Sequence, residues 1–384
     1  MRRAGRNTAD SRRTCRLELP GWLPGVRARL EKLIRANSGK GLPVVFDFDN
    51  TIVCGDIGEA TLAVLTRSGR LCRQNISVTL CPPFRPAKGE PMLPGNSAEV
   101  TDYYEALLAP TFHGLKDPSP LSNGYVWAVE IMEGLSPWEI IEATKTAFEL
   151  SRPHQIKLIQ STPGKAVFPA PFFYEQTVEL IARLIKHEFD VWVISASNVW
   201  SVRWMIANGL NPRLRRWGIS SGIQPQNVVG VSTLLTDREH RLFKDPILVK
   251  ENQRYAKLQK HELEKLKLTS RLHFPAPIYS GKVACILDFI GHRPWLCVGD
   301  SPGDHAMAAY SEHRLWLARL EKPAYQKATI DLLKRCDGNP WMIQPIIAAG
   351  GIGFIDRPEA PVRNSMSAAV RRSEKLLANV ERGQ

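Results

Sequence analysis

The feature that most constrains the fold is a short apolar segment, residues 42–48, that runs into two aspartates. Residues 44–46 are apolar without interruption, which is typical of a strand buried on both faces in a parallel sheet. Because side chains alternate along a strand, the carboxylates of Asp47 and Asp49 face the same side at its carboxyl end. Open α/β sheets bind their ligands at this end, so the pair is the first candidate for chemistry.

From Thr162 onward, apolar segments with strand character alternate with segments of helical periodicity. This alternation predicts βαβ units and an α/β fold with a doubly wound, Rossmann-like parallel sheet. We expect strands at 190–195, 227–231, 294–300 and 315–320, and helices at 174–187, 198–207, 249–268, 282–290 and 304–310.

The segment after the first strand interrupts this alternation. Residues 81–120 contain eight prolines, which break long regular elements, and residues 122–150 return to helical spacing. We therefore expect a mostly helical cap domain, inserted into the α/β core over the ligand-binding edge of the sheet. The expected division is a basic N-terminal arm and helix at 1–40, a catalytic core at 41–62 and 165–350, the cap domain at 63–164, and a C-terminal tail at 351–384.

The net charge of +13 is concentrated in the N-terminal arm. Residues 1–40 hold eleven Lys and Arg against three Asp and Glu, whereas residues 41–353 are nearly neutral. A nucleic-acid-binding domain carries its positive charge on the folded face, and no such motif is present, so no nucleic-acid partner is expected. We expect a solvated arm up to an amphipathic helix around 23–34, and we expect removal of residues 1–36 to leave catalysis unchanged.

Two further observations exclude classes of protein. No segment approaches the roughly 20 apolar residues of a membrane-spanning helix, and the arm lacks the apolar stretch of a secretory signal. Seven cysteines occur without a C-x-x-C pair, which argues against a structural zinc site and a disulfide framework. We expect a cytoplasmic protein that does not insert into a membrane, although the Arg-rich arm also fits an organelle transit peptide. The oligomeric state stays open.

Polar residues suited to phosphate chemistry follow two further strands. Ser195 ends one expected strand, Asp300 ends another with Asp304 shortly after it, and Lys282 precedes the helix between them. Each has a purely structural alternative: turn formation by the aspartates, helix capping by the serines and acids, and an ordinary surface position for the lysine. These alternatives do not explain why carboxylates gather at two strand ends with a hydroxyl and a lysine between them.

The same residues resemble a known family over residues 42–320. The chain is similar to the haloacid dehalogenase (HAD) superfamily of phosphohydrolases, and most similar to its C1-capped group of phosphoserine and phosphorylcholine phosphatases. It departs from that group by continuing Ser-Ala-Ser where the group has glycines after the serine. The motifs that carry the resemblance, in order, are Asp47-x-Asp49-x-Thr51, Ser195 after an apolar strand, Lys282, and Gly-Asp300-Ser-x-x-Asp304.

The resemblance implies a role for each motif residue. Asp47 would attack phosphorus and form an aspartyl-phosphate, and Asp49 would protonate the leaving oxygen and then activate water. Thr51 would orient Asp49 at the substrate, and Ser195 would bind phosphoryl oxygens together with a lysine. The candidates for that lysine are Lys282, which we prefer, and Lys244 or Lys250.

The resemblance also implies Mg²⁺ as the cofactor, because this ion prefers oxygen ligands and keeps several waters. Asp47, Asp300 and the backbone carbonyl of Asp49 would supply the ligands, and Asp304 would hold a metal-bound water. We therefore expect a Mg²⁺-dependent phosphatase that hydrolyses a small organic phosphate monoester. A HAD-fold phosphomutase or other phosphotransferase and a non-catalytic phosphate-binding protein remain alternatives.

One residue gives an indication of the substrate. Asp56 lies where phosphoserine phosphatases have an acid that contacts the substrate ammonium, although it is also suited to cap the helix that follows. Carboxylates and aromatic faces both hold ammonium groups, so we expect an amine-bearing phosphate such as phosphorylcholine, phosphoethanolamine or phosphoserine. The aromatic residues of the expected cap domain are Tyr103, Tyr104, Tyr125, Trp127 and Trp138.

Overall fold

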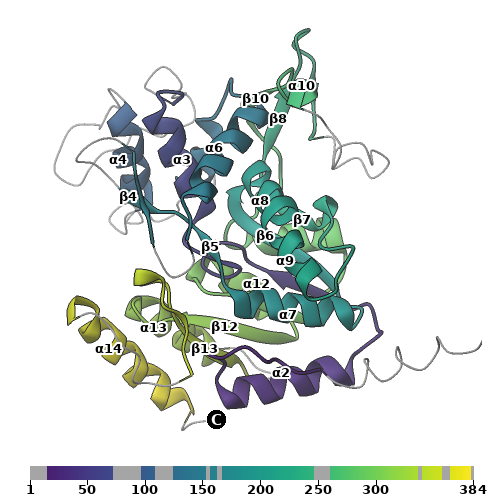
Figure 1. Cartoon of the computed structure of the whole chain (residues 1–384), viewed down its shortest axis with the longest axis vertical. Helices are drawn as coiled ribbons and strands as arrows, with labels where there is room; N and C mark the ends of the chain where they lie inside the picture. Colours follow the sequence, from purple (N-terminus) through teal and green to yellow (C-terminus); the bar gives the residue numbers. More distant parts are fainter. Residues whose placement is uncertain are drawn as a thin grey trace, which may run out of the picture.

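In the computed structural model of the chain, a seven-stranded sheet crosses the molecule (Figure 1). Neighbouring strands are parallel, except that the last strand of the chain pairs antiparallel at one edge. The predicted α/β fold with a parallel sheet is confirmed. The strands in spatial order are β14 (Gly353–Phe354), β13 (Met342–Ile347), β12 (His313–Arg319), β11 (Leu296–Gly299), β1 (Pro43–Phe46), β6 (Asp190–Asn198) and β7 (Val228–Val231). The structure describes residues 15–71, 97–108, 124–152, 156–161, 167–245, 260–335, 340–356 and 364–381.

Strand β1 is buried on both faces, as its uninterrupted apolar sequence predicts. Val44 and Phe46 belong to the larger hydrophobic core, and Val45 belongs to a smaller core on the opposite face. Helices therefore cover both sides of the sheet. Those of the larger core are α2 (Pro24–Ala36), α7 (Glu175–Lys186), α8 (Val199–Met205), the π-helical turn η4 (Ile206–Leu210) and α9 (Asn211–Arg216); those of the smaller core are α11 (Gly281–Cys285), the π-helical turn η8 (Ile286–Ile290), α12 (His305–Tyr310), α13 (Pro323–Leu333) and α14 (Asn364–Glu381).

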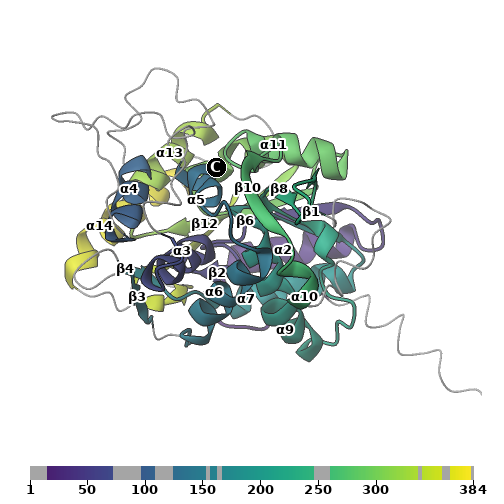
Figure 2. The same cartoon turned by 90° about the horizontal axis from the view of Figure 1, so that it is seen from above.

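A second group of helices lies above one edge of the sheet (Figures 1 and 2). These helices pack against one another and against β6, and they follow β1 in the chain, where the cap domain is expected. The domain boundaries themselves stay a prediction. The helices are α3 (Ile57–Arg67), α4 (Ser97–Leu108), α5 (Gly124–Glu130) and α6 (Pro137–Glu149), accompanied by the pairs β2 (Val53–Cys54) with β5 (Phe172–Phe173) and β3 (Leu158–Gln160) with β4 (Val167–Pro169).

Part of the proline-rich segment is regular, contrary to expectation. Helix α4 lies inside it, and Val100, Tyr104 and Leu107 on that helix are buried. The reason is the spacing of the prolines: Pro94 and Pro110 bracket the helix, and no proline interrupts it. The remainder of residues 81–120 lies outside the described part of the chain.

The prediction of a long charged helix at 249–268 is also wrong at the C-terminal end of that range. Only Lys260–Leu263 is helical (α10), and residues 246–259 lie outside the described part. The chain then forms strand β10 (Lys267–Leu272), in which Leu268 is buried opposite Leu235. This cross-strand burial outweighs the helical propensity of a Lys- and Glu-rich sequence. The sheet that results comprises β10, β8 (Thr233–Thr236) and β9 (Leu242–Phe243).

The N-terminal arm is part of the folded structure from residue 15. The expected amphipathic helix is present as α2, but Leu17 and Trp22 before it are also buried, and the Trp22 ring packs edge-on against Phe354. The buried carboxylate of Glu179 accepts hydrogen bonds from the backbone at residues 18 and 19. The expectation of a solvated arm before α2 is therefore wrong for residues 15–22, and the burial of Leu17 and Trp22 argues against the expectation that residues 1–36 can be removed without effect.

The C-terminal segment also contributes to the core. On α14, Val370 and Leu377 are buried, and the Ser373 hydroxyl donates to the carbonyl of Leu320 at 2.7 Å. The segment expected as a tail thus covers one face of the sheet beside α13 (Figure 1). Among the described helices, none combines the length and hydropathy required to cross a membrane.

Candidate active site

A cavity of about 490 Å³ opens at the carboxyl end of β1, between the sheet and the helices above it. The position follows from the topology, because β1 lies between β6 and β11 and all three strands point the same way. The parallel ladder therefore brings residues from distant parts of the sequence to one edge. The predicted residues that line the cavity are Asp47, Asp49, Asp56, Lys282 and Asp300.

Lys282 connects two carboxylates at the base of this cavity. Its ammonium donates to Asp47 Oδ1 and to Asp304 Oδ1, each at 2.6 Å, and the side chain is 3% exposed. Burial opposes the charge, but Asp304 and Asp47 raise the pKa of the lysine above its usual value. Lys244 is exposed, and Lys250 lies outside the described residues, so among the described candidates the geometry favours Lys282.

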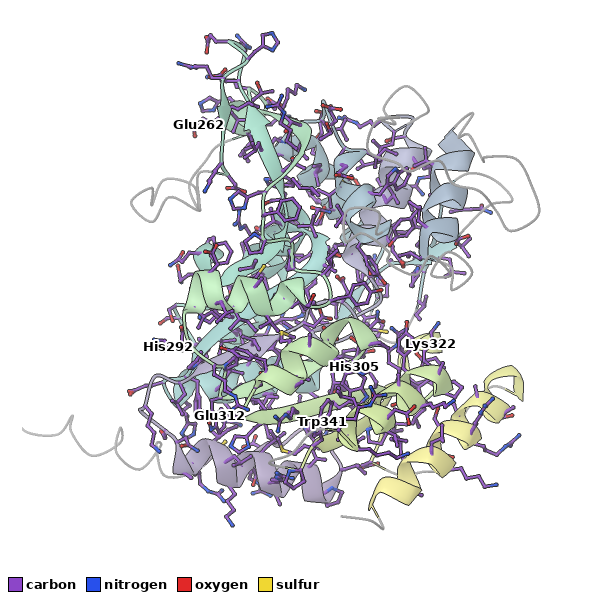
Figure 3. The ribbon with its side chains drawn as sticks, turned by 180° about the vertical axis from the view of Figure 1, so that it is seen from behind. Glu262, His292, His305, Glu312, Lys322 and Trp341 are labelled. Carbon is purple, nitrogen blue, oxygen red and sulfur yellow. The ribbon has the colours of Figure 1, made fainter. Side chains whose placement is uncertain are left out.

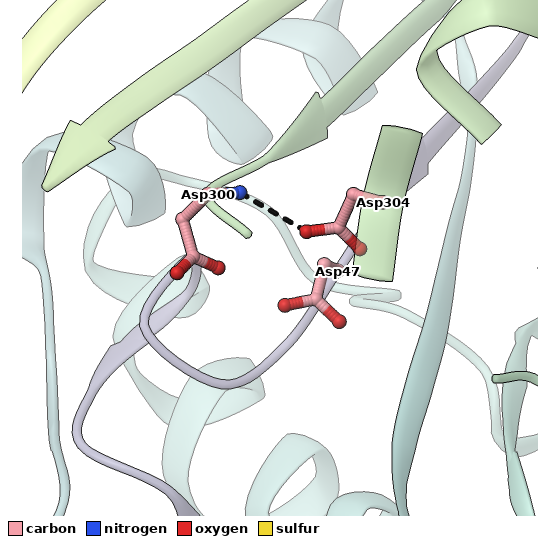
Figure 4. A group of neighbouring side chains, drawn as sticks. All are labelled: Asp47, Asp300 and Asp304. Atoms are coloured by element: carbon pink, nitrogen blue, oxygen red, sulfur yellow. Dashed lines mark hydrogen bonds between the residues drawn. The ribbon is translucent and has the colours of Figure 1, made fainter. Parts of the chain in front are cut away.

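Three aspartates gather around one point beside Lys282 (Figure 4). Asp47, Asp300 and Asp304 are buried, and one carboxylate oxygen from each lies within 4.8 Å of the others. Asp304 Oδ2 accepts from the amides of Asp300 and Ser301, each at 3.1 Å, in a capping box at the short helix η9 (Pro302–Asp304). The capping alternative is therefore confirmed for Asp304.

Burial and mutual repulsion dominate the electrostatics of this cluster. Burial first, and then Asp304, raise the pKa of Asp47 well above its usual range, against the opposing effect of Lys282. Burial raises the pKa of Asp300 to about 7, although Arg319 counteracts it. A group of hard oxygen ligands that repel one another in a buried site suits a small divalent cation, so these residues fit Mg²⁺.

Asp49 is held by donors from two elements. Its Oδ1 accepts from the amide of Ile57 at 2.7 Å, and its Oδ2 accepts from the hydroxyls of Ser197 at 2.7 Å and Ser195 at 3.2 Å. Burial, followed by the charges of Asp56 and Asp47, raises the pKa of Asp49 well above its usual range. The carboxyl group is thus fixed in orientation beside Asp47 without a cationic partner of its own in the described contacts.

Two residues differ in their contacts from what the resemblance implies. The Thr51 hydroxyl is fully buried and donates to Asp300 Oδ1 at 3.0 Å, so it orients Asp300 and not Asp49. A tight turn causes this, because Asn50 has a φ of 57° and Thr51 bonds back to the Phe48 carbonyl. Ser195 is also fully buried and directed at Asp49, and its role as a phosphate contact stays a prediction.

An acidic and aromatic corner closes the side of the cavity next to α3. Asp56 caps that helix, accepting from the Glu59 amide at 2.9 Å, so the capping alternative is confirmed, and it also lines the cavity. Burial, and then Asp56, raise the pKa of Glu59 to about 8. Tyr104 donates to Glu59 Oε1 at 3.3 Å, and Tyr125 lines the cavity beside it.

Trp127 and Trp138, two of the other expected aromatic residues, do not contribute to this corner. Trp127 is buried among apolar neighbours, and Trp138 lines a separate surface groove with Arg70. The side chain of Tyr103 lies outside the described part. Of the four predicted aromatics whose side chains the structure describes, Tyr104 and Tyr125 lie at the acidic corner.

Sequence reasoning missed several residues at the site, among them Arg319, Ser197 and Lys322. Arg319, at the carboxyl end of β12, donates to Asp300 Oδ2 at 3.3 Å and to Glu321 at 3.1 Å. The strand-end argument that found Asp300 would have found Arg319 as well. Ser197 donates to Asp49, and helix capping, the structural alternative for the serines, is performed by Asn198, which accepts from the Ser201 amide. Lys322, which lies below α3–α6 in Figure 3, completes this side of the cavity.

Comparisons with known proteins agree with the class that the fold and site indicate. No family model matches the chain. A phosphorylcholine phosphatase of Pseudomonas aeruginosa is 28% identical over 289 residues, which cover 74% of this chain and 75% of that protein. The resemblance to phosphohydrolases is thereby confirmed, and the enzyme class that it supports is a phosphatase.

One solved structure shares the fold. A functionally unknown protein from Anaerococcus prevotii aligns with a TM-score of 0.57 and 16% identity, covering 92% of this chain and 99% of its own. A substrate-bound phosphoserine phosphatase aligns with a TM-score of 0.36 and 12% identity, covering 78% of this chain and 92% of its own. The first of these likenesses supports the α/β architecture.

Proposed function

We propose that the protein is a Mg²⁺-dependent phosphatase that hydrolyses a small, amine-bearing phosphate monoester through an aspartyl-phosphate. The observation that carries this proposal is the position of Asp47 in the cavity, with Lys282 on one of its oxygens and Asp49 beside it. The phosphatase relative supports the same reaction class.

The first step transfers the phosphoryl group to the enzyme. Asp47 Oδ1 already accepts from Lys282, so Oδ2 is the oxygen that attacks phosphorus. A bond from Oδ2 to phosphorus forms as the bond from phosphorus to the leaving oxygen breaks, and Asp49 donates a proton to that oxygen. The product alcohol leaves, and the phosphoryl group stays on Asp47.

The second step restores the enzyme. Asp49, now ionised, takes a proton from a water molecule that attacks the phosphorus atom, and the bond from phosphorus to Asp47 breaks. Inorganic phosphate leaves and the carboxylate of Asp47 is free again. Lys282 offsets the negative charge on the phosphoryl oxygens in both steps.

The cation would be held by Asp47, Asp300 and the backbone carbonyl of Asp49, with Asp304 in contact through water. When bound, it neutralises charge on the phosphoryl group. Thr51 and Arg319 each hold one oxygen of Asp300, and this fixes the ligand that would face the cation.

We expect the Asp300→Asn variant to need at least about tenfold more Mg²⁺ for half-maximal hydrolysis of p-nitrophenyl phosphate. The amide replaces a charged oxygen ligand by a neutral one, which weakens the attraction for a small divalent ion. The measurement is a Mg²⁺ titration of activity, paired with calorimetric titration of Mg²⁺ into the substrate-free protein.

Asp331→Asn is the matched control, because this aspartate lies on the surface in a 3.7 Å pair with Lys334. Exposed pairs contribute little to stability, so the variant should keep the Mg²⁺ requirement of the original chain. Unchanged Mg²⁺ binding in Asp300→Asn would exclude Asp300 as a ligand.

The acidic corner supports an ammonium group on the substrate. Asp56, Glu59 and the ring of Tyr125 line the same part of the cavity, and carboxylates and aromatic faces are the groups that bind such cations. The relative's name, phosphorylcholine phosphatase, agrees with this chemistry.

We expect kcat/KM to be at least about tenfold higher for phosphorylcholine than for glycerol phosphate, since each cation contact contributes about 1 kcal/mol. In Asp56→Asn the preference should fall by about threefold to tenfold, while p-nitrophenyl phosphate is hydrolysed as before. Asn is as good a helix cap as Asp, so α3 keeps its N-terminus in this variant. Equal kcat/KM for phosphorylcholine and glycerol phosphate in the original chain would rule out the ammonium site.

A further inference from the structure

Ser197 has a position that the mechanism above does not use. It lies at the end of β6, is 7% exposed and lines the cavity, and its hydroxyl lies 2.7 Å from Asp49 Oδ2. The next acceptor, Asp56 Oδ1, is farther away at 3.4 Å. Because a hydroxyl has one proton, the shorter contact to Asp49 is the one that it satisfies.

Neither hydrogen of Ser197 is free to bind a phosphate. The hydroxyl donates to Asp49, and the backbone amide donates to Ser195 Oγ at 3.0 Å. A phosphate contact would require one of these bonds to break. The residue therefore serves the carboxylate of Asp49 and not the substrate.

The surrounding backbone leaves space for this contact. Gly58, in the first turn of α3, lies so close that a Cβ there would be 2.6 Å from Ser197 Oγ. On the other side, a Cβ at Gly230 in β7 would be 2.8 Å from the Ser197 carbonyl oxygen. Two glycines thus let the Ser197 segment fit between α3 and β7.

The hydrogen bonds around Asp49 determine which oxygen can exchange a proton. A carboxylate has about four acceptor positions, two on each oxygen. On Oδ2 both are used, by Ser197 and Ser195, whereas Oδ1 accepts only from Ile57 among the described residues. The remaining position on Oδ1 is the one left for the substrate.

We propose that Ser197 is a positioning residue for Asp49: it saturates Oδ2 and so directs proton transfer to the leaving group through Oδ1. This inference rests on the proposed function, in which Asp49 is the general acid. Without Ser197, the Asp χ2 angle, which has broad minima, lets the proton reside on an oxygen turned away from the substrate.

The test compares leaving groups in Ser197→Ala. An alkoxide must be protonated as it leaves, whereas p-nitrophenolate leaves as a stable anion. We expect kcat/KM to fall by about tenfold to hundredfold for phosphorylcholine and glycerol phosphate, and by less than about threefold for p-nitrophenyl phosphate, since general acid catalysis contributes about 10²–10⁴-fold in all. The ratio kcat/KM is used because it reports only the steps up to departure of the leaving group.

Three further variants complete the test. Gly58→Ala displaces the Ser197 hydroxyl and should give the same leaving-group dependence, and Ser197→Thr, which keeps a hydroxyl, should restore most of the loss. Ser201→Ala is the control: this serine is also buried, and its hydroxyl bonds to Thr144 at 2.6 Å away from the cavity. This variant should change kcat/KM by the same factor for all three substrates.

The inference is overturned if Ser197→Ala lowers kcat/KM equally for all three substrates, or for none of them. If the original chain hydrolyses none of the substrates with Mg²⁺ present, the proposed function itself fails. The two failures are therefore distinguishable in a single set of assays.

Discussion

Replacing Asp47 with Asn is expected to lower kcat/KM for p-nitrophenyl phosphate by a factor on the order of 10⁴ or more. The amide oxygen is too weak a nucleophile to form the covalent intermediate, and no other described carboxylate at the site is free to replace it. The loss should be the same for good and poor leaving groups, because the attacking atom is missing in both cases. Steady-state assays with both kinds of substrate measure it.

The fold should survive this substitution. Asp47 adds negative charge to a buried group that already holds Asp300 and Asp304, and Lys282 keeps its 2.6 Å contact with Asp304 when Asp47 is neutral. We therefore expect a melting temperature within about 4 °C of the original chain, a shift that corresponds to about 1 kcal/mol or less. Measurable turnover in a pure Asp47→Asn preparation would contradict the proposed mechanism.

Deleting residues 1–36 is expected to prevent the chain from folding. Leu17, Leu30 and Ile34 have no exposed surface, and burial of each such side chain contributes about 1.5–3 kcal/mol. Their sum, with Trp22 added, is comparable to the whole free energy of unfolding of a typical domain, about 5–15 kcal/mol. Circular dichroism and thermal unfolding of the truncated protein measure the effect.

Deletion of residues 1–14, which lie outside the described part of the chain, is the matched comparison. This truncation removes several arginines and keeps Leu17, Trp22 and α2, so we expect stability and turnover to be retained. A stable, active protein lacking residues 1–36 would show that these contacts are dispensable.

The central sheet was predictable because its strands carry their own signal. Residues 44–46, 191–194 and 296–298 are uninterrupted apolar segments. Such segments predict buried strands, and the structure has a strand of the central sheet at each of them. The N-terminal arm was not predictable in this way. Leu17 and Trp22 are isolated apolar residues in a basic segment, and their burial depends on partners such as Phe354 far along the chain.

The candidate site likewise contains residues that the sequence predicts and contacts that it does not. Asp47, Lys282 and Asp300 were found because each follows or precedes an element with a clear pattern, and the parallel sheet then brings them together. The contacts of Thr51 and Ser197 depend on a left-handed Asn50 and on a helix cap one residue later than expected. Such details follow from turn geometry, which a periodicity does not encode.

The pairing of β1 has a consequence for the order in which the protein forms during synthesis. Val44 emerges early, but its neighbours in the sheet are Val191 and Leu296, so one edge of β1 is paired only after about half of the chain has been made and the other edge only after about three quarters. Parallel pairing over such separations is slow, because the closure of long loops comes before the contacts that reward it. Asp47 is thus among the first residues made, and the cavity around it is completed only when Arg319, Lys322 and Tyr325 have left the ribosome. Until then an apolar strand has an unpaired edge, which favours aggregation of the newly made chain.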